Sequence, residues 1–171
     1  YVELNVRGVL AAKVRAWIAT ANLKDLHVEA PVGTRARARG RYQSLFVALE
    51  ERRAQGLEVR ILHGGAPSRV LAQKLSGTKK QRDTLMRQCP RVHLKMIAID
   101  GEKLYLGSAN FTGAGLGAKA EGRRNFEAGI LTTDDLLLDE MQSTFDRIFG
   151  GKECASCKLR GECPRPIDTY A

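Results

Sequence analysis

The feature that most constrains how this chain can fold is a pair of alternating segments joined by Asp100-Gly101. Residues 92–100 alternate apolar and polar side chains, and residues 103–107 resume a strand-like pattern. A period of two predicts half-buried β-strands. An Asp-Gly pair between two such runs is a strong signal for a hairpin turn. The middle of the sequence therefore predicts two antiparallel strands that meet at a tight turn.

Strand and helix patterns alternate on both sides of this hairpin. The other predicted strands cover residues 16–23, 57–62 and 125–131, and the predicted helices cover residues 42–55, 67–75 and 134–149. Thr133 is a candidate N-cap of the last helix, whose predicted inward face holds Leu138, Met141, Phe145 and Ile148. This alternation predicts an α/β fold with one mixed β-sheet sandwiched by helices. We expect residues 1–150 to form a single domain and residues 151–171 a short cysteine-rich tail.

The predicted hairpin carries chemically active side chains at a fixed spacing. His93 and Lys95 are two residues apart, and such residues project from one face of a strand. Asp100 follows at the turn, and Asn125 and Glu127 form a later pair. The complete order is H-x-K-x4-D-x6-G-S-x-N, followed by N-x-E. Each residue alone would be an ordinary strand, surface or turn residue, so it is the joint spacing that indicates a site.

This order resembles the histidine–lysine–aspartate motif of the phospholipase D superfamily. The resemblance covers residues 16–149 in element order and is most specific over residues 93–127. It implies a phospholipase D-like fold and a phosphodiesterase that works through a covalent phosphohistidine intermediate. The implied catalytic residues are His93, Lys95, Ser108, Asn110, Glu127 and, as structural support at the turn, Asp100.

The chemistry of phosphodiester hydrolysis suggests a role for each of these side chains. A neutral imidazole can attack phosphorus, so His93 is the expected nucleophile. Lys95 would supply a fixed positive charge to the phosphate. Ser108 and Asn110 would donate hydrogen bonds to the same phosphate oxygens. Glu127 is expected to accept a hydrogen bond from the other imidazole nitrogen of His93 and so set its tautomer.

The chain holds one copy of the motif, whereas the mechanism needs a second histidine to protonate the leaving oxygen. His27 and His63 stand outside the motif spacing and are interpreted as ordinary histidines. Single-motif members of the superfamily are homodimers with the active site on the two-fold axis, which implies a homodimer here. His93 of one chain would be the nucleophile and His93 of the other the general acid. No acidic cluster accompanies the motif, so we expect no catalytic metal and an activity that survives chelation.

The charge of the chain favours a polyanionic substrate. There are 28 Lys and Arg residues against 19 Asp and Glu residues, for a formal net charge of +9. Basic segments around the motif would follow a nucleic-acid backbone through phosphate contacts. The candidate nucleic-acid-binding residues are Arg35, Arg37, Arg39, Arg41, Lys79, Lys80, Arg123 and Arg124. A solvated basic surface is the alternative interpretation of the same charges.

The predicted function is a metal-independent endonuclease, with DNA favoured over RNA as the partner. A lipid phosphodiesterase of the same mechanism and a non-catalytic nucleic-acid-binding module are the alternatives. The sequence has no apolar run near the roughly 20 residues of a transmembrane helix. It also shows no secretory signal at its start and no amphipathic anchor rich in Trp or Phe. We therefore expect no stable membrane association and a cytoplasmic location.

Four cysteines form a second pattern. Cys154, Cys157 and Cys163 follow a C-x2-C-x5-C-P spacing, and Cys89 stands alone upstream. This pattern resembles the iron–sulfur staple of some helicase-associated and CRISPR-associated nucleases, which implies a structural [4Fe–4S] cluster on all four cysteines. Four thiolates also suit Zn²⁺, and four free cysteines are the third interpretation. A bound metal would tie the tail to the segment just before His93.

Overall fold

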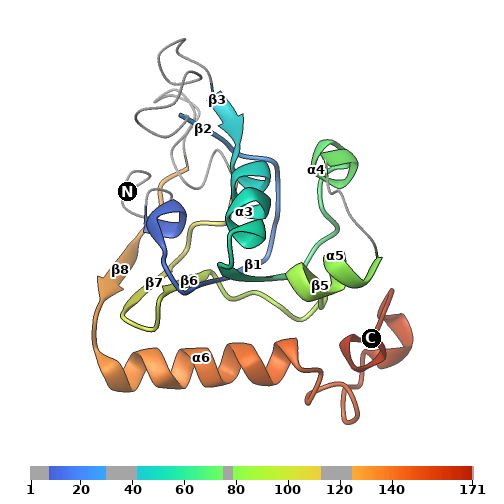
Figure 1. The fold of residues 1–171 in the computed structure, drawn as a ribbon. Helices are drawn as coiled ribbons and strands as arrows, with labels where there is room; N and C mark the ends of the chain where they lie inside the picture. The colour runs from blue at the N-terminus through green and yellow to red at the C-terminus, as the bar shows by residue number, and fades with distance from the viewer. Residues whose placement is uncertain (1–7, 30–41, 75–78, 113–124, 171) are drawn as a thin grey trace.

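The computed structural model describes residues 8–29, 42–74, 79–112 and 125–170, and its centre is a six-stranded sheet (Figure 1). In chain order the strands are β1 (Arg15–Thr20), β4 (Glu58–His63), β5 (Met86–Gln88), β6 (Met96–Ile99), β7 (Lys103–Gly107) and β8 (Gly129–Thr132). Their order across the sheet is β5-β4-β1-β6-β7-β8. Strands β1, β4 and β5 pair in parallel, whereas β6, β7 and β8 pair antiparallel. The sheet is therefore mixed, as the sequence predicts.

Helices cover both faces of this sheet. They are α3 (Leu45–Ala54), α4 (Arg69–Lys74), α5 (Lys79–Leu85) and α6 (Asp135–Phe149), with the 3-10 turns η2 (Arg160–Glu162) and η3 (Ile167–Thr169) in the tail. In Figure 1, α3 lies on one side of the sheet and α6 runs along the other. Residues of β1 alternate between the two sides: Ala16 and Ile18 pack with α3, and Trp17 and Ala19 pack with α6. The predicted α/β sandwich is confirmed.

The predicted hairpin is present, and Asp100-Gly101 forms its turn. Strand β6 pairs with β7 so that Met96 lies opposite Leu106. Asp100 has a φ of 57° and Gly101 a φ of 75°, which is the left-handed region that Gly adopts freely and Asp tolerates. The backbone amide of Glu102 donates to the Ile99 carbonyl at 3.0 Å and closes the turn.

Two strands begin later than the sequence pattern predicts. Strand β6 begins at Met96, so His93 and Lys95 lie in the segment before it. Its partner β1 ends at Thr20, directly beyond the Ala19–Met96 pair, and cannot extend the ladder to residues 92–95. Strand β8 likewise begins at residue 129, where it meets the end of β7, so residues 125–128 precede the strand.

The helix predicted over residues 42–55 is divided in the structure. Tyr42–Ser44 forms strand β3, which pairs antiparallel with β2 (His27–Glu29), and α3 covers only Leu45–Ala54. Tyr42 has the spacing of an apolar helix face with Leu45 and Leu49, but it is 63% exposed and lies opposite Glu29. Gly56, which follows the helix, has a φ of 102°, a left-handed conformation that commonly ends a helix.

Helix α6 has the predicted inward face but a different cap. Leu138 and Phe145 are buried, and Met141 and Ile148 pack beside them. The N-cap is Asp134 rather than Thr133, because the Asp134 carboxylate accepts from the Leu137 amide at 2.8 Å. Among the described residues, neither this helix nor any other has the length and apolar character needed to cross a bilayer.

The tail after α6 folds back beside α5 (Figure 1). The guanidinium of Arg165 donates two hydrogen bonds to the buried Asp83 carboxylate, at 2.7 and 2.6 Å. Ile167 is buried in the same core as α6, and Arg165 lies 3.7 Å from the Tyr170 ring centroid. The tail is therefore packed onto the sheet domain.

Candidate active site

His93 and Lys95 face each other in the short segment that leads into β6. The Lys95 Nζ lies 3.2 Å from each ring nitrogen of His93 and donates to the His93 carbonyl at 3.0 Å. The His93 side chain is exposed, which leaves the ring accessible to a substrate.

Ser108 and Glu127 form a hydrogen-bonded unit beside this pair, at the junction of β7 and β8. The Ser108 Oγ donates to the Glu127 carboxylate at 2.5 Å, and the Ala128 amide donates to the same Oγ at 3.0 Å. Asn125 donates to the other carboxylate oxygen of Glu127 at 3.1 Å. Within the described part of the chain, the hydrogen bonds to Glu127 thus come from Ser108 and Asn125, whereas His93 was the expected donor. Glu127 lies just before β8, and Ser108 lies just after β7, so the pairing of Gly107 with Gly129 brings the two residues together.

Asn110 is fixed by residues that follow β1. Its Oδ1 accepts from the Asn22 backbone amide at 3.0 Å and from the Thr20 Oγ1 at 3.3 Å. Thr20 is fully buried, and its Oγ1 also accepts from the Phe111 amide at 2.9 Å. These contacts occupy the carbonyl side of the Asn110 amide, so the Nδ2 group is the part that can donate to a phosphate. The sequence signal for Thr20 and Asn22 is that they are polar residues at the end of a buried strand and just beyond it.

Asp100 lies at the other end of β6 and makes structural contacts. Its carboxylate accepts from the consecutive backbone amides of Lys13, Val14 and Arg15, at 2.9, 2.8 and 3.0 Å. Burial alone would raise the pKa of Asp100, but these three hydrogen bonds lower it below its ordinary value. The carboxylate therefore fixes the entry into β1, which fits the supporting role expected from the sequence.

His63 is a site neighbour that the sequence did not indicate. It ends β4, opposite Thr20 at the end of β1, and its Nδ1 lies 2.8 Å from the Gly65 carbonyl. Burial lowers its pKa below the ordinary value, although the Gly65 contact opposes this. The His63 carbonyl accepts from the Cys89 amide at 2.9 Å. The backbone of His63 thus contacts the turn that leads to His93.

Most of the predicted nucleic-acid-binding residues fall outside the described residues. Lys79 and Lys80 open α5, although their side chains are not among those described. The remaining six are Arg35, Arg37, Arg39, Arg41, Arg123 and Arg124, and all of them lie beyond the described ranges. Their proximity to His93 therefore stays a prediction.

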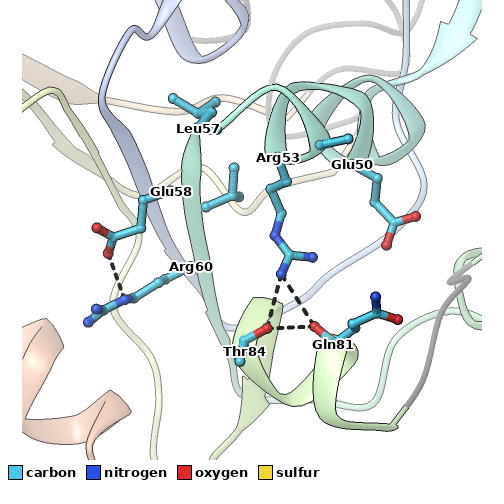
Figure 2. Close-up of a pocket in the computed structure, with 10 residues that line it drawn as sticks. Glu50, Arg53, Leu57, Glu58, Arg60, Gln81 and Thr84 are labelled. Carbon is cyan, nitrogen blue, oxygen red and sulfur yellow. Dashed lines mark hydrogen bonds and ion pairs between the residues drawn. The ribbon is translucent and has the colours of Figure 1, made fainter.

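A hollow of about 560 Å³ lies away from the motif, between α3, α5 and the start of β4 (Figure 2). Arg53 points across it and donates to the Thr84 Oγ1 at 3.0 Å, and Arg60 is paired with Glu58 at 2.8 Å. Strand β4 runs from this hollow toward His63, so the hollow and the motif lie at opposite ends of the strand. The hollow does not contribute to the candidate active site.

The four cysteines all line a second, smaller cavity between the tail and the segment before His93. Among the described residues, no group of three or more His, Cys, Asp or Glu side chains is arranged to hold a single metal ion. The cysteine cavity is considered separately below, because it lies outside the His93 site.

Comparisons with known proteins agree with this fold. The family model described as "cardiolipin synthase, PLD-like domain" matches residues 11–149. No curated protein sequence matches the chain.

Among solved structures, NucT from Helicobacter pylori is 16% identical with a TM-score of 0.51, covering 85% of this chain and 84% of its own. Nuc from Salmonella typhimurium, a phospholipase D family member, is 17% identical with a TM-score of 0.55, covering 84% of this chain and 82% of its own. Phosphatidylserine synthase from Haemophilus influenzae is 14% identical with a TM-score of 0.58, covering 86% of this chain and 34% of its own. These likenesses establish the fold, and the family match spans most of the sequence. This chain therefore belongs to the phospholipase D superfamily, in the family of cardiolipin synthase-type PLD-like domains.

Proposed function

We propose that this protein is a phosphodiesterase of the phospholipase D type that cleaves nucleic acid. Its superfamily supports the phosphodiesterase class. The observation that carries the proposal is that the segments bearing His93, Lys95 and Asn110 lie at the same end of the central strands. Strand β6 is antiparallel to both β1 and β7, so its start lies beside their ends, and the motif segments meet there.

In the proposed reaction, an unprotonated ring nitrogen of His93 attacks the phosphorus. The bond from phosphorus to the leaving oxygen breaks, and that oxygen takes a proton from a general acid. The group that gave up its proton then takes one from water as that water attacks the phosphohistidine, the phosphorus–nitrogen bond breaks, and His93 is released. Lys95 Nζ and the Nδ2 group of Asn110 stabilise the negative charge on the non-bridging oxygens.

The general acid in this proposal is His93 of a second copy of the chain. A single motif provides one such histidine, so the site is complete only in a homodimer. Exposed apolar residues in and around β8 support a contact along this strand. They are Phe126, Ile130, Leu131 and Leu136, which are 107, 55, 53 and 82% exposed. Strand β8 is also an edge of the sheet, and apolar edge strands are usually covered by a partner.

Nucleic acid is proposed as the substrate because of charge. The formal net charge of +9 attracts a phosphate backbone, and each neutralised phosphate releases counterions. A phospholipid is the second candidate, since the exposed apolar residues in and around β8 would also suit a lipid surface. A non-catalytic binding module would retain the phosphate contacts and lack turnover.

The test is cleavage of labelled single- and double-stranded DNA and RNA in the presence of EDTA. We compare the wild type with His93→Asn and with His27→Asn, a matched control in β2 that lies outside the motif. Cleavage by the wild type and His27→Asn that is lost by at least about a thousandfold in His93→Asn supports the proposal. An acid-labile phosphoryl adduct, trapped in the wild type and absent from His93→Asn, supports the covalent intermediate.

Other outcomes separate the alternatives. Equal cleavage by His93→Asn would contradict the assigned nucleophile. Transfer or hydrolysis of phospholipid headgroups without nucleic-acid cleavage would establish the lipid alternative. Binding of DNA by a confirmed dimer, with neither activity, would establish the non-catalytic module.

A further inference from the structure

The three cysteines of the tail are brought to one side by successive tight turns. The Cys154 amide donates to the Gly151 carbonyl, the Cys157 amide to the Cys154 carbonyl, and the Cys163 amide to the Arg160 carbonyl, at 3.0, 3.3 and 3.3 Å. Each hydrogen bond joins residues that are three apart, so the tail consists of successive tight turns. All three cysteines line the same cavity as a result.

Cys89 completes the set from a distant part of the chain. It follows β5 directly and lines the same cavity, which has a volume of about 30 Å³. Apolar residues close the cavity around the sulfur atoms: Ile148 from α6 and Leu159 and Ile167 from the tail. All four thiols are free, so no disulfide accounts for their convergence.

The charges around the cavity favour bound thiolates. The Arg91 guanidinium donates to the Cys157 sulfur at 3.6 Å, and this contact lowers the pKa of Cys157 below its ordinary value. Arg160 lines the same cavity, so two guanidinium groups lie where they can stabilise thiolates.

The arrangement of the four cysteines bears on which metal group they would bind. A single Zn²⁺ bound by four thiolates at about 2.3 Å draws the sulfur atoms to roughly 3.8 Å from one another. Within the described residues, no three ligand side chains are placed for a single ion, although four cysteines surround one cavity. A cubane cluster binds its four thiolates at separate iron corners and so accommodates a wider arrangement.

We propose that Cys89, Cys154, Cys157 and Cys163 together bind one structural [4Fe–4S] cluster. The cluster would join two segments that are far apart in sequence: the tail after α6 and the turn from Cys89 to Val92. That turn is closed by the Val92 amide, which donates to the Cys89 carbonyl at 2.9 Å, and it leads directly to His93.

The same turn is held tightly on its inner side. Cys89 donates its amide to the His63 carbonyl at 2.9 Å, and a Cβ atom at Gly64 would lie 2.5 Å from the Val92 carbonyl oxygen. A change at the cluster is therefore transmitted to the backbone that positions His93. The cluster itself is proposed from the cysteines alone and does not depend on the proposed function.

The experiment measures iron, acid-labile sulfide and zinc in the full chain purified without oxygen. We expect about four iron and four sulfide per chain, with broad visible absorption that disappears on reduction. Cys89→Ser and Cys154→Ser should each lose most of the iron. Ser156→Ala, an exposed position between Cys154 and Cys157, is the matched control and should retain it.

The outcomes are distinguishable from failure to fold and from failure of the proposed function. Circular dichroism of each variant reports folding, and oxidative removal of iron from the wild type, followed by reconstitution with ferrous iron and sulfide, tests the site without any substitution. About one zinc per chain with no iron would overturn the cluster. Iron that survives in both Cys variants, or a folded wild type that binds no metal before or after reconstitution, would overturn the four-cysteine site. Nuclease activity is not a readout in any of these measurements.

Discussion

The carboxylate of Asp100 shows how one side chain can determine where a strand begins. It binds the backbone amides of Lys13, Val14 and Arg15, immediately before and at the start of β1. Those amides cannot all be satisfied by the sheet, because the chain is still turning as it enters β1. The turn of the β6–β7 hairpin and the first residues of the central strand are thereby held together.

Asp100→Asn should lower the free energy of unfolding at pH 7 by about 1 kcal/mol, because it removes the charge on the acceptor of three hydrogen bonds in a partly solvated position. The folded-state pKa of Asp100 is depressed, so this stabilisation is present above the unfolded pKa of about 3.9 and is lost as the pH falls through the lower folded value. Urea denaturation of both proteins at pH 7 and near pH 3 measures the difference.

Asp139→Asn, on the exposed side of α6, is the control and should change stability by less than about 0.5 kcal/mol. If both substitutions cost the same, or if the difference for Asp100→Asn grows at low pH, the assigned contacts do not stabilise the fold.

At the level of elements, the boundary of α6 is set by a cap that the sequence pattern placed one residue too early. Asp134→Ala should destabilise the protein by about 1 kcal/mol, because the Leu137 amide loses its acceptor. Thr133→Ala should be within about 0.5 kcal/mol of the wild type. Thermal or urea unfolding of the two variants side by side checks this, and a larger loss in Thr133→Ala would reverse the assignment.

Elements with their own local signal were predicted well from the sequence. Strand β7 was predicted over residues 103–107 and observed over Lys103–Gly107, because alternation and the Asp-Gly turn are both local. Strand β3 was missed because Tyr42 has the spacing of a helix face and becomes a strand residue only by pairing with Glu29. The start of β6 was misplaced for the same reason, since a strand ends where its partner does.

The residues of the candidate site also fall into those that local spacing predicts and those that only strand pairing brings together. His93 and Lys95 were predicted from spacing, and the structure places them in contact. Asn22 and His63 were not indicated, because they approach the motif only through the parallel pairing of β1 with β4 and the antiparallel pairing of β1 with β6. The Glu127–Ser108 contact depends on the pairing of β7 with β8, which the motif spacing does not encode.

At the level of the whole molecule, the proposed dimer can be tested at an exposed side chain. Leu136 is 82% exposed in the first turn of α6, where an acidic residue suits the helix dipole. Leu136→Asp should therefore leave the monomer folded and weaken dimerisation at least tenfold, measured by sedimentation. Val70→Asp, at a 54% exposed position in the first turn of α4, is the matched control. A wild type that cleaves substrate as a monomer would refute the shared site.

The attachment of the tail gives a second prediction at this level. Arg165→Met removes both hydrogen bonds to Asp83, which is only 7% exposed, and leaves that carboxylate without this partner. Proteolysis of residues 150–170 in the folded protein should then be several-fold faster than in the wild type. Arg147→Met breaks the exposed ion pair with Glu153 and should have little effect. Equal protection in both variants would show that the Arg165–Asp83 pair does not hold the tail.

The position of β1 in the sheet has a consequence for synthesis of the protein. This strand is almost entirely buried and pairs with β4 on one side and β6 on the other, yet β6 is translated long after β1. During translation, the backbone N–H and C=O groups on both edges of this apolar strand are unpaired until its partner strands have left the ribosome. The hairpin and α6, by contrast, are made of neighbouring segments and can assemble as soon as they emerge. We therefore expect closure of the sheet around β1 to be the slow step in the folding of this protein.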